Sequence, residues 1–313
     1  MELAGLRKGQ LDGLVGGPPC QGFSRMGKRN PKDCRNNLFV DFFRLVRETK
    51  PSFFVAENVQ GILDEPYERI RKRALKLVSD EYLVLEPVEV TASEYGAPTT
   101  RTRVFFFGFK KRRFETPDST LFETNKSIAR ITVKDALKGL PTRIDPRWLS
   151  EEMSWRQVGK MGRGRFADSI TGRVPEGVGD PASLERYENK SEASGFLATR
   201  HDAEVRERFA HVSQGSTDSV SRAPRLKLDG YCPTLRAGTG KDRGSYQSLR
   251  PIHPTADRVI TPREAARLQG FPDWFQFHPT KWHSFRQIGN SVSPIVAERI
   301  LRLILSKINV VSI

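Results

Sequence analysis

Residues 11–24 read Leu-Asp-Gly-Leu-Val-Gly-Gly-Pro-Pro-Cys-Gln-Gly-Phe-Ser, and this stretch decides the class of fold. Its first five residues are an apolar run of strand length, which glycine and proline then end in a loop. In α/β proteins, catalytic residues often follow the carboxyl ends of such strands. A lone cysteine is more often an inert, half-buried residue, but the rigid Pro-Pro-Cys-Gln setting favours Cys20 as a nucleophile.

The chain around this stretch alternates between strand and helix patterns. Apolar residues recur at helical spacing before Pro51, and a new apolar run of strand length follows that proline. Alternation of this kind is typical of an α/β fold. The predicted elements are strands at 11–15, 53–56, 82–90 and 103–109 and helices at 38–49 and 62–79.

The second half of the chain is less regular. Residues 143–256 are rich in Gly, Arg, Ser and Asp, which predicts a loop-rich second domain. Around it, Thr132 caps a short helix through Leu137, and a capping box at Thr261 with Pro262 and Glu264 begins another. The block from Thr261 to Leu268 is most simply structural scaffold, and a last amphipathic helix is expected from about Pro294 to Leu305.

Composition restricts the classes of function. The 313 residues include 52 Lys and Arg against 37 Asp and Glu, a net charge of +15. Such an excess favours a polyanionic partner, although a generally basic surface is the alternative. Three scattered cysteines are too few for a disulfide framework or a zinc site and fit a reducing compartment. No apolar run approaches the ~18 residues of a membrane span, so we expect a cytoplasmic protein.

Five segments in series resemble the motifs of the DNA (cytosine-5) methyltransferases, in the family's order and across nearly all of the chain. One such motif would be weak evidence, but five at plausible spacings make chance an unlikely explanation. The resemblance is to the bacterial restriction-modification type. Its segments are Pro18-Pro19-Cys20-Gln21, Glu57-Asn58-Val59, Arg101-Thr102-Arg103, the block Thr261–Leu268, and Gln287-Ile288-Gly289-Asn290-Ser291-Val292.

The resemblance implies a doubly wound, Rossmann-like methyltransferase sheet with a smaller target-recognition domain. Residues 1–142 would form the catalytic domain, 143–256 the recognition domain, and 257–313 a return to the catalytic domain. Family members carry a Phe-x-Gly-x-Gly cofactor loop before the Pro-Cys motif, whereas only 19 residues precede Cys20 here. The N-terminal strands and cofactor loop are therefore expected to be missing, through a late start codon, a fragment, or a separate N-terminal chain.

The chemistry implied by the resemblance explains the choice of residues. Carbon 5 of cytosine is a poor nucleophile, so Cys20 would add to carbon 6 before the methyl group of S-adenosylmethionine reaches carbon 5. Glu57 follows an apolar strand, so it would emerge at the same sheet edge as Cys20 and contact nitrogen 3. A glutamate favoured only by a helix dipole is the structural alternative.

Two arginines alternate just before an apolar strand, so Arg101 and Arg103 would share one face. Surface ion pairs are the structural alternative for both. By resemblance, Arg103 holds the cytosine carbonyl oxygen and Arg101 helps to organise the active-site loop. One departure is Thr99, where the family usually has Gln.

Contacts to DNA and cofactor also follow from the resemblance. A base inside a duplex hides carbon 6, so the cytosine must flip out, and the basic loop 21–37 is suited to close over duplex DNA. A solvated charge run is the simpler interpretation of that loop alone. The predicted DNA contacts are Gln21, Ser24, Arg25, Lys28, Arg35, Thr234, Leu235 and Arg236, and the predicted cofactor contacts are Pro19, Leu38, Asn290, Ser291 and Val292.

Two other functions fit parts of the sequence. The family's RNA-methylating relative has a compact recognition region, and the long segment 143–256 favours DNA over RNA. A DNA-binding remnant, or one half of a split methyltransferase, would keep the base pocket without holding cofactor. A companion restriction endonuclease is a further expected partner.

Overall fold

The computed structural model describes residues 5–19, 22–23, 33–111, 117–123, 128–145, 148, 155–237 and 250–308. The chain divides into two compact units. The sheet unit comprises Met1–Thr91, Thr102–Asn125 and Arg299–Ile313, and the helical unit comprises Ala92–Arg101 and Lys126–Glu298. These units are groups of residues that pack together, whereas the boundaries at residues 142 and 256 separate expected functions. Those two boundaries therefore stay predictions.

A five-stranded mixed sheet forms the centre of the sheet unit. The strands are ordered β1-β2-β5-β3, and β4 also pairs with β5. Among the described strands of this sheet, only β1 and β2 run parallel, while β2, β3 and β4 are antiparallel to β5. Pro87 cannot donate to a ladder, which explains why the strand predicted at 82–90 is two strands instead of one. The bounds are β1 (Gly13–Gly16), β2 (Phe53–Asn58), β3 (Tyr82–Val84), β4 (Val88–Thr91) and β5 (Thr102–Lys110).

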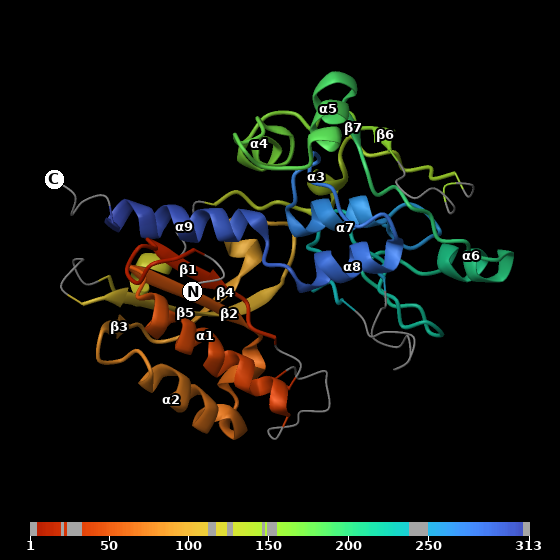
Figure 1. The fold of residues 1–313 in the computed structure, drawn as a ribbon. Helices are drawn as coiled ribbons and strands as arrows, with labels where there is room; N and C mark the ends of the chain where they lie inside the picture. The colour runs from red at the N-terminus through yellow and green to blue at the C-terminus, as the bar shows by residue number, and fades with distance from the viewer. Residues whose placement is uncertain are drawn as a thin grey trace. The chain divides into compact units, whose positions relative to one another are not determined.

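Helices cover both faces of this sheet, which confirms the α/β class (Figure 1). On one face lie α1 (Asn37–Thr49) and α2 (Glu68–Lys76), and the part of α9 (Pro294–Ile308) that belongs to this unit lies on the other. The helix predicted at 62–79 is shorter, because two 3₁₀ turns take up 60–67. Aromatic rings meet edge to face in the core beneath α1, among them Phe39, Phe43, Phe54 and Phe106.

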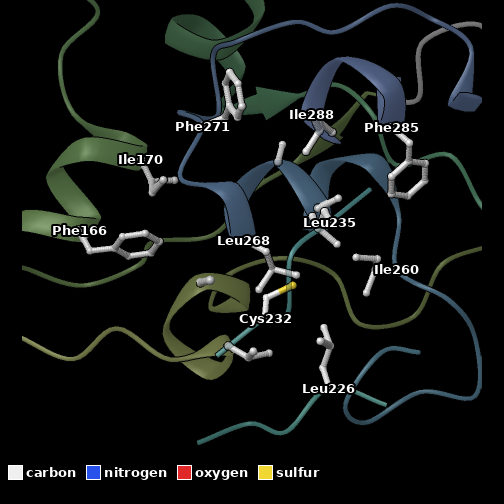
Figure 2. Packing of buried hydrophobic residues seen from close by; sticks show 14 of the residues in the cluster. Phe166, Ile170, Leu226, Cys232, Leu235, Ile260, Leu268, Phe271, Phe285 and Ile288 are labelled. Atoms are coloured by element: carbon white, nitrogen blue, oxygen red, sulfur yellow. The ribbon is translucent and has the colours of Figure 1, made fainter. Parts of the chain in front are cut away.

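The helical unit has its own apolar core, part of which Figure 2 shows. In its described residues, the region predicted to be loop-rich carries helices of 7, 10 and 8 residues, joined by mostly irregular segments. Among the helices in the described ranges, none has the length and apolar character needed to cross a membrane. The elements are α3 (Val133–Leu137), β6 (Arg156–Gln157), α4 (Arg165–Thr171), α5 (Pro181–Lys190), β7 (Glu192–Ala193), α6 (Ala203–Ala210), α7 (Pro262–Gln269) and α8 (Lys281–Asn290).

Helix α7 is buried along its whole length, including its charged residues. The predicted capping box is confirmed, since the Thr261 amide donates to Glu264 and the Glu264 amide donates to the Thr261 hydroxyl. Arg267 and Asp273 form a fully buried ion pair at 2.6 Å. Buried charges persist only when paired, so these contacts give the block a structural role within its unit.

A buried histidine beside α7 makes the stability of the helical unit dependent on pH. The Thr255 amide donates to His253 Nδ1, so Nε2 carries the proton and lies 3.5 Å from Glu264. Burial lowers the pKa of His253 to about 4, against the attraction of Glu264. Because the unfolded chain protonates this residue near pH 6.5, the folded state loses stability as pH falls from there to about 4.

We therefore expect the free energy of unfolding to fall by about 3 kcal/mol over that window through His253 alone. Denaturant unfolding between pH 7 and pH 4 measures it. His253→Asn keeps an acceptor for Thr255 and should flatten this part of the profile, whereas the same change at the exposed His278 should not. Equal slopes for the wild type and His253→Asn would show that another group carries the dependence.

Candidate active site

Glu57 and Arg103 form an ion pair at the edge of the sheet unit. The register of β2 and β5 sets Glu57 opposite Phe105, and the Arg103 Nε atom donates to Glu57 Oε1 at 2.9 Å. Both side chains are mostly buried, at 16% and 15% exposure. A charge-assisted hydrogen bond of this length holds the Glu57 carboxylate in one orientation.

The loop after β1 lies against this carboxylate. The parallel register continues from Gly16 opposite Ala56, which brings Gly17 beside Glu57. A Cβ atom at Gly17 would lie 3.1 Å from Glu57 Oε2, so glycine permits the close approach. One residue further, the Asn58 side chain donates to the carbonyl oxygen of Pro18 at 3.2 Å. The Pro18–Pro19 segment and Glu57 therefore lie at the same edge of the sheet. The predicted path of this loop can be followed as far as Pro19, the last described residue before Cys20.

The chain is anchored again just beyond Cys20. The Tyr67 hydroxyl donates to the Gly22 carbonyl at 2.6 Å, and the fully buried Phe23 meets the Tyr67 ring edge to face. A Cβ atom at Gly22 would collide with the Asn36 amide, so any larger residue there would displace the buried Asn36 side chain. Both flanks of the Pro-Cys motif are thus fixed to the sheet unit. Five predicted site residues lie outside the described residues: Cys20, Gln21, Ser24, Arg25 and Lys28.

The remaining predicted contacts in the sheet unit are exposed to different degrees. Arg35 is ion-paired with Asp33 at 2.5 Å, and its side chain is 40% exposed. Pro19 is exposed, and Leu38 at the start of α1 is 42% exposed. On β1, Val15 is 56% exposed although its strand partner Val55 is buried. Three apolar side chains near this strand edge and at the start of α1 are therefore exposed to solvent.

Arg101 has partners quite different from those of Arg103. It is 2% exposed and donates to the carbonyl oxygens of Leu235 and Gly289, at 3.2 and 2.8 Å. Strand β5 begins only at Thr102, so Arg101 lies outside the strand whose alternation predicted a shared face. Within the helical unit, Arg101 thus acts on backbone groups.

The other predicted residues of the helical unit fall into two segments. Leu235 is 5% exposed and packs in the core, while its neighbours Thr234 and Arg236 are exposed. Any side-chain contact with DNA in this segment therefore falls to these two neighbours. At the end of α8, Asn290 is exposed, and Ser291 and Val292 are partly exposed. The Ser291 hydroxyl donates to the Ile288 carbonyl, which caps the helix.

Two residues that support the predicted site segments were not predicted from the sequence. The Tyr67 hydroxyl donates to the carbonyl oxygen of Gly22, 45 positions away. Arg250 donates to the carbonyl oxygen of Arg236 at 3.0 Å, and its guanidinium lies 4.0 Å from the centre of the Phe285 ring. Burial lowers the pKa of Arg250 to about 10. Neither residue belongs to a motif, so no local pattern singles them out.

The arrangement in the sheet unit suits chemistry on a polar heterocycle. A fixed carboxyl group can exchange a proton or hydrogen-bond with a ring nitrogen, and a guanidinium beside it can stabilise a carbonyl oxygen. In the sequence, Cys20 comes directly after the Pro18–Pro19 segment. Within the described residues, no cluster of His, Cys, Asp and Glu could hold a metal ion.

Comparison with known proteins agrees with this chemistry. The sequence profile of the C-5 cytosine-specific DNA methylases matches residues 2–306. The Type II methyltransferase M.XorII of Xanthomonas oryzae pv. oryzae is 40% identical over 311 residues, which cover 95% of this chain and 69% of that protein. The Type II methyltransferase M.DdeI of Desulfomicrobium norvegicum is 32% identical, covering 92% of this chain and 71% of that protein.

Solved structures give the same result. A prophage-encoded protein of E. coli, described as a DNA modification methyltransferase, superposes with a TM-score of 0.84 at 51% identity, over 95% of this chain and 79% of that chain. S. pombe Dnmt2 shares the fold, with a TM-score of 0.57 at 17% identity over 96% of this chain and 79% of that chain. The chain belongs to the C-5 cytosine-specific DNA methylase family. It is a DNA (cytosine-5)-methyltransferase of the kind found in bacterial restriction-modification systems.

Proposed function

We propose that this protein transfers a methyl group from S-adenosylmethionine to carbon 5 of a flipped-out cytosine in duplex DNA, through a covalent bond between Cys20 and carbon 6. The observation that carries the proposal is the Glu57 carboxylate, which Arg103 fixes at the strand edge beside the Pro18–Pro19 segment. That edge is where a base would meet a carboxyl group, a guanidinium and a thiol together.

Each of these side chains has a defined task. The Cys20 thiolate adds to carbon 6, and the electron pair of the 5,6 double bond moves toward carbon 5 and the ring carbonyl. Glu57 hydrogen-bonds to nitrogen 3 and supplies the proton that limits negative charge on the ring, and Arg103 stabilises the carbonyl oxygen. Once carbon 5 has formed its bond to the transferred methyl group, removal of the carbon 5 proton by a base restores the double bond and expels the thiolate, and nitrogen 3 returns its proton to Glu57.

Exposed apolar side chains of the sheet unit supply contacts for S-adenosylmethionine in this proposal. Val15 on β1 and Pro19 just after it lie toward the carboxyl end of a parallel strand pair, where α/β proteins bind nucleotides, and Leu38 is exposed at the start of α1. By family resemblance, Asn290, Ser291 and Val292 would hold the methionine end. When bound, S-adenosylmethionine supplies a methyl group on a positively charged sulfur. The role of these residues is to hold that group and exclude water.

Duplex DNA is the proposed partner, consistent with the net charge of +15. The Type II relatives favour a companion restriction endonuclease, whose site this modification would protect. We also propose a cytoplasmic location, because that compartment holds the DNA of a bacterium. We propose residues 143–256 as the target-recognition domain, between the catalytic segments 1–142 and 257–313.

Radiolabelled S-adenosylmethionine provides the direct test. We expect the purified protein to transfer label to plasmid DNA and not to transfer RNA, and digestion of the DNA should yield 5-methyl-2′-deoxycytidine as the sole labelled nucleoside. Bisulfite sequencing of the same plasmid should then show one recurring site. Label in RNA would favour the RNA-methylating alternative, and salt-dependent DNA binding without any transfer would favour a binding protein.

A further inference from the structure

The last turn of α8 lies directly against the segment Thr234–Ala237. A Cβ atom at Gly289 would lie 2.4 Å from the Ala237 nitrogen and 2.6 Å from the Arg236 carbonyl carbon. Both neighbours are backbone atoms, so they cannot move aside as a flexible side chain could. Gly289 is therefore required here for close approach, and this helical turn and the segment must shift together.

Arg101 joins the same two segments by hydrogen bonds. The Gly289 carbonyl lies at the end of α8, where helix carbonyls have no intrahelical partner, and Arg101 Nη2 donates to it at 2.8 Å. The other terminal nitrogen donates to the Leu235 carbonyl at 3.2 Å. One buried guanidinium thus caps α8 and holds the segment, and its rigid fork fixes the spacing between the two carbonyls.

Packing around this junction is continuous. Leu235 and Ile288 belong to one apolar cluster (Figure 2), and the Cys232 amide and carbonyl pair with Pro98 and Thr100. Beyond the junction, the Gln269 side chain donates to the Ser291 carbonyl at 3.1 Å. The exposed residues Thr234 and Arg236 thus connect to the turn at Asn290 through buried, hydrogen-bonded contacts.

We propose that Gly289 and Arg101 are positioning residues that couple DNA binding to cofactor binding. This inference rests on the proposed function, because that function assigns DNA to Thr234 and Arg236 and the methionine end of S-adenosylmethionine to Asn290–Val292. DNA that orders the first segment also orders the turn, so the cofactor pays less ordering entropy when it follows. Coupling of this kind is reciprocal and typically changes affinity about 5- to 150-fold.

The test compares, for the wild type and each variant, the affinity for a cofactor analogue with and without DNA, and the ratio of the two affinities is the coupling. The dissociation constant of S-adenosylhomocysteine, which resembles the cofactor but allows no turnover, is determined by calorimetry with and without a duplex that carries the site mapped above. In the wild type, the duplex should tighten binding at least about fivefold. Gly289→Ala should lower this ratio toward one, because its new methyl group separates the two segments.

Arg101→Lys should act in the same direction, since a single ammonium cannot match the fork of the guanidinium. Gly159→Ala is the matched control, because its Cβ atom would meet its nearest neighbours at an ordinary 3.4 Å. By reciprocity, the ratio measured for DNA with and without S-adenosylhomocysteine must fall by the same factor.

The outcomes separate coupling from mere structural support. A structural role alone would lower the melting temperature, or weaken both ligands, and leave the ratio at its wild-type value, which would overturn the proposal. A wild-type ratio of one would overturn it without any variant, and Arg101→Lys decides if Gly289→Ala does not fold. Failure of the proposed function is distinct, because the wild type would then transfer no methyl group to plasmid DNA.

Discussion

Cys20→Ser abolishes methyl transfer, with an expected loss of at least about 10⁴-fold in kcat and little change in the affinity for DNA. A serine hydroxyl is far more weakly ionised than a thiol at neutral pH, so addition to carbon 6 fails. The loss should appear in kcat because the nucleophile acts after binding. Initial rates of labelled methyl transfer, together with a DNA-binding titration, measure both quantities.

Cys34→Ser is the matched control for this change. Cys34 is an exposed free cysteine in the same unit that is neither the proposed nucleophile nor a predicted DNA contact, so it tests the cost of losing a thiol as such. We expect its activity to stay within about twofold of the wild type. If Cys20→Ser instead lost DNA binding together with activity, the cysteine would be a structural residue of the loop.

Glu57→Gln has the second largest expected effect, a fall in kcat of about 10²–10⁴-fold. The amide keeps the size of the side chain and can still lie beside Arg103, but it supplies no proton to nitrogen 3. At 1.36 kcal/mol for each tenfold change, this corresponds to about 3–5 kcal/mol of lost transition-state stabilisation. Single-turnover rates with saturating DNA and cofactor isolate the covalent step from binding and product release.

The control for Glu57→Gln is the same change at Glu86, an exposed residue of the sheet unit. Its rate should match the wild type, because surface substitutions rarely change a site some distance away. Near-normal turnover of Glu57→Gln would remove the carboxyl group from the mechanism. The Arg103 contact would then serve only to hold strands β2 and β5 in register.

Much of the sheet unit could be predicted from local patterns. Apolar runs of strand length precede both Glu57 and the Pro-Pro-Cys loop, and both runs form strands. The two strands are parallel, so Glu57 and Pro18 lie at the same edge of the sheet. The cap at Thr132 and the capping box at Thr261 also appear as predicted, because capping is decided within four residues. Local chemistry of this kind needs no tertiary information.

The features that the sequence did not reveal depend on distant partners. Arg101 contacts residues 134 and 188 positions away, and its burial cannot be inferred from alternation with Arg103. Helix α8 was missed because its Gly289 and two aromatic residues, Trp282 and Phe285, have low helix propensity. Packing of Phe285 and Ile288 in the apolar core stabilises that helix, and such tertiary effects override propensity.

Covalent trapping tests the central claim most directly. Duplex DNA in which 5-fluorocytosine replaces the target cytosine is incubated with the protein and S-adenosylmethionine, and the denatured product is digested and analysed by mass spectrometry. Fluorine cannot leave carbon 5 as a proton does, so methyl transfer should leave the enzyme bonded to carbon 6. We predict a methylated nucleotide adduct on the peptide that contains Cys20. An adduct on a different residue, or none from a preparation that methylates ordinary DNA, would contradict the mechanism.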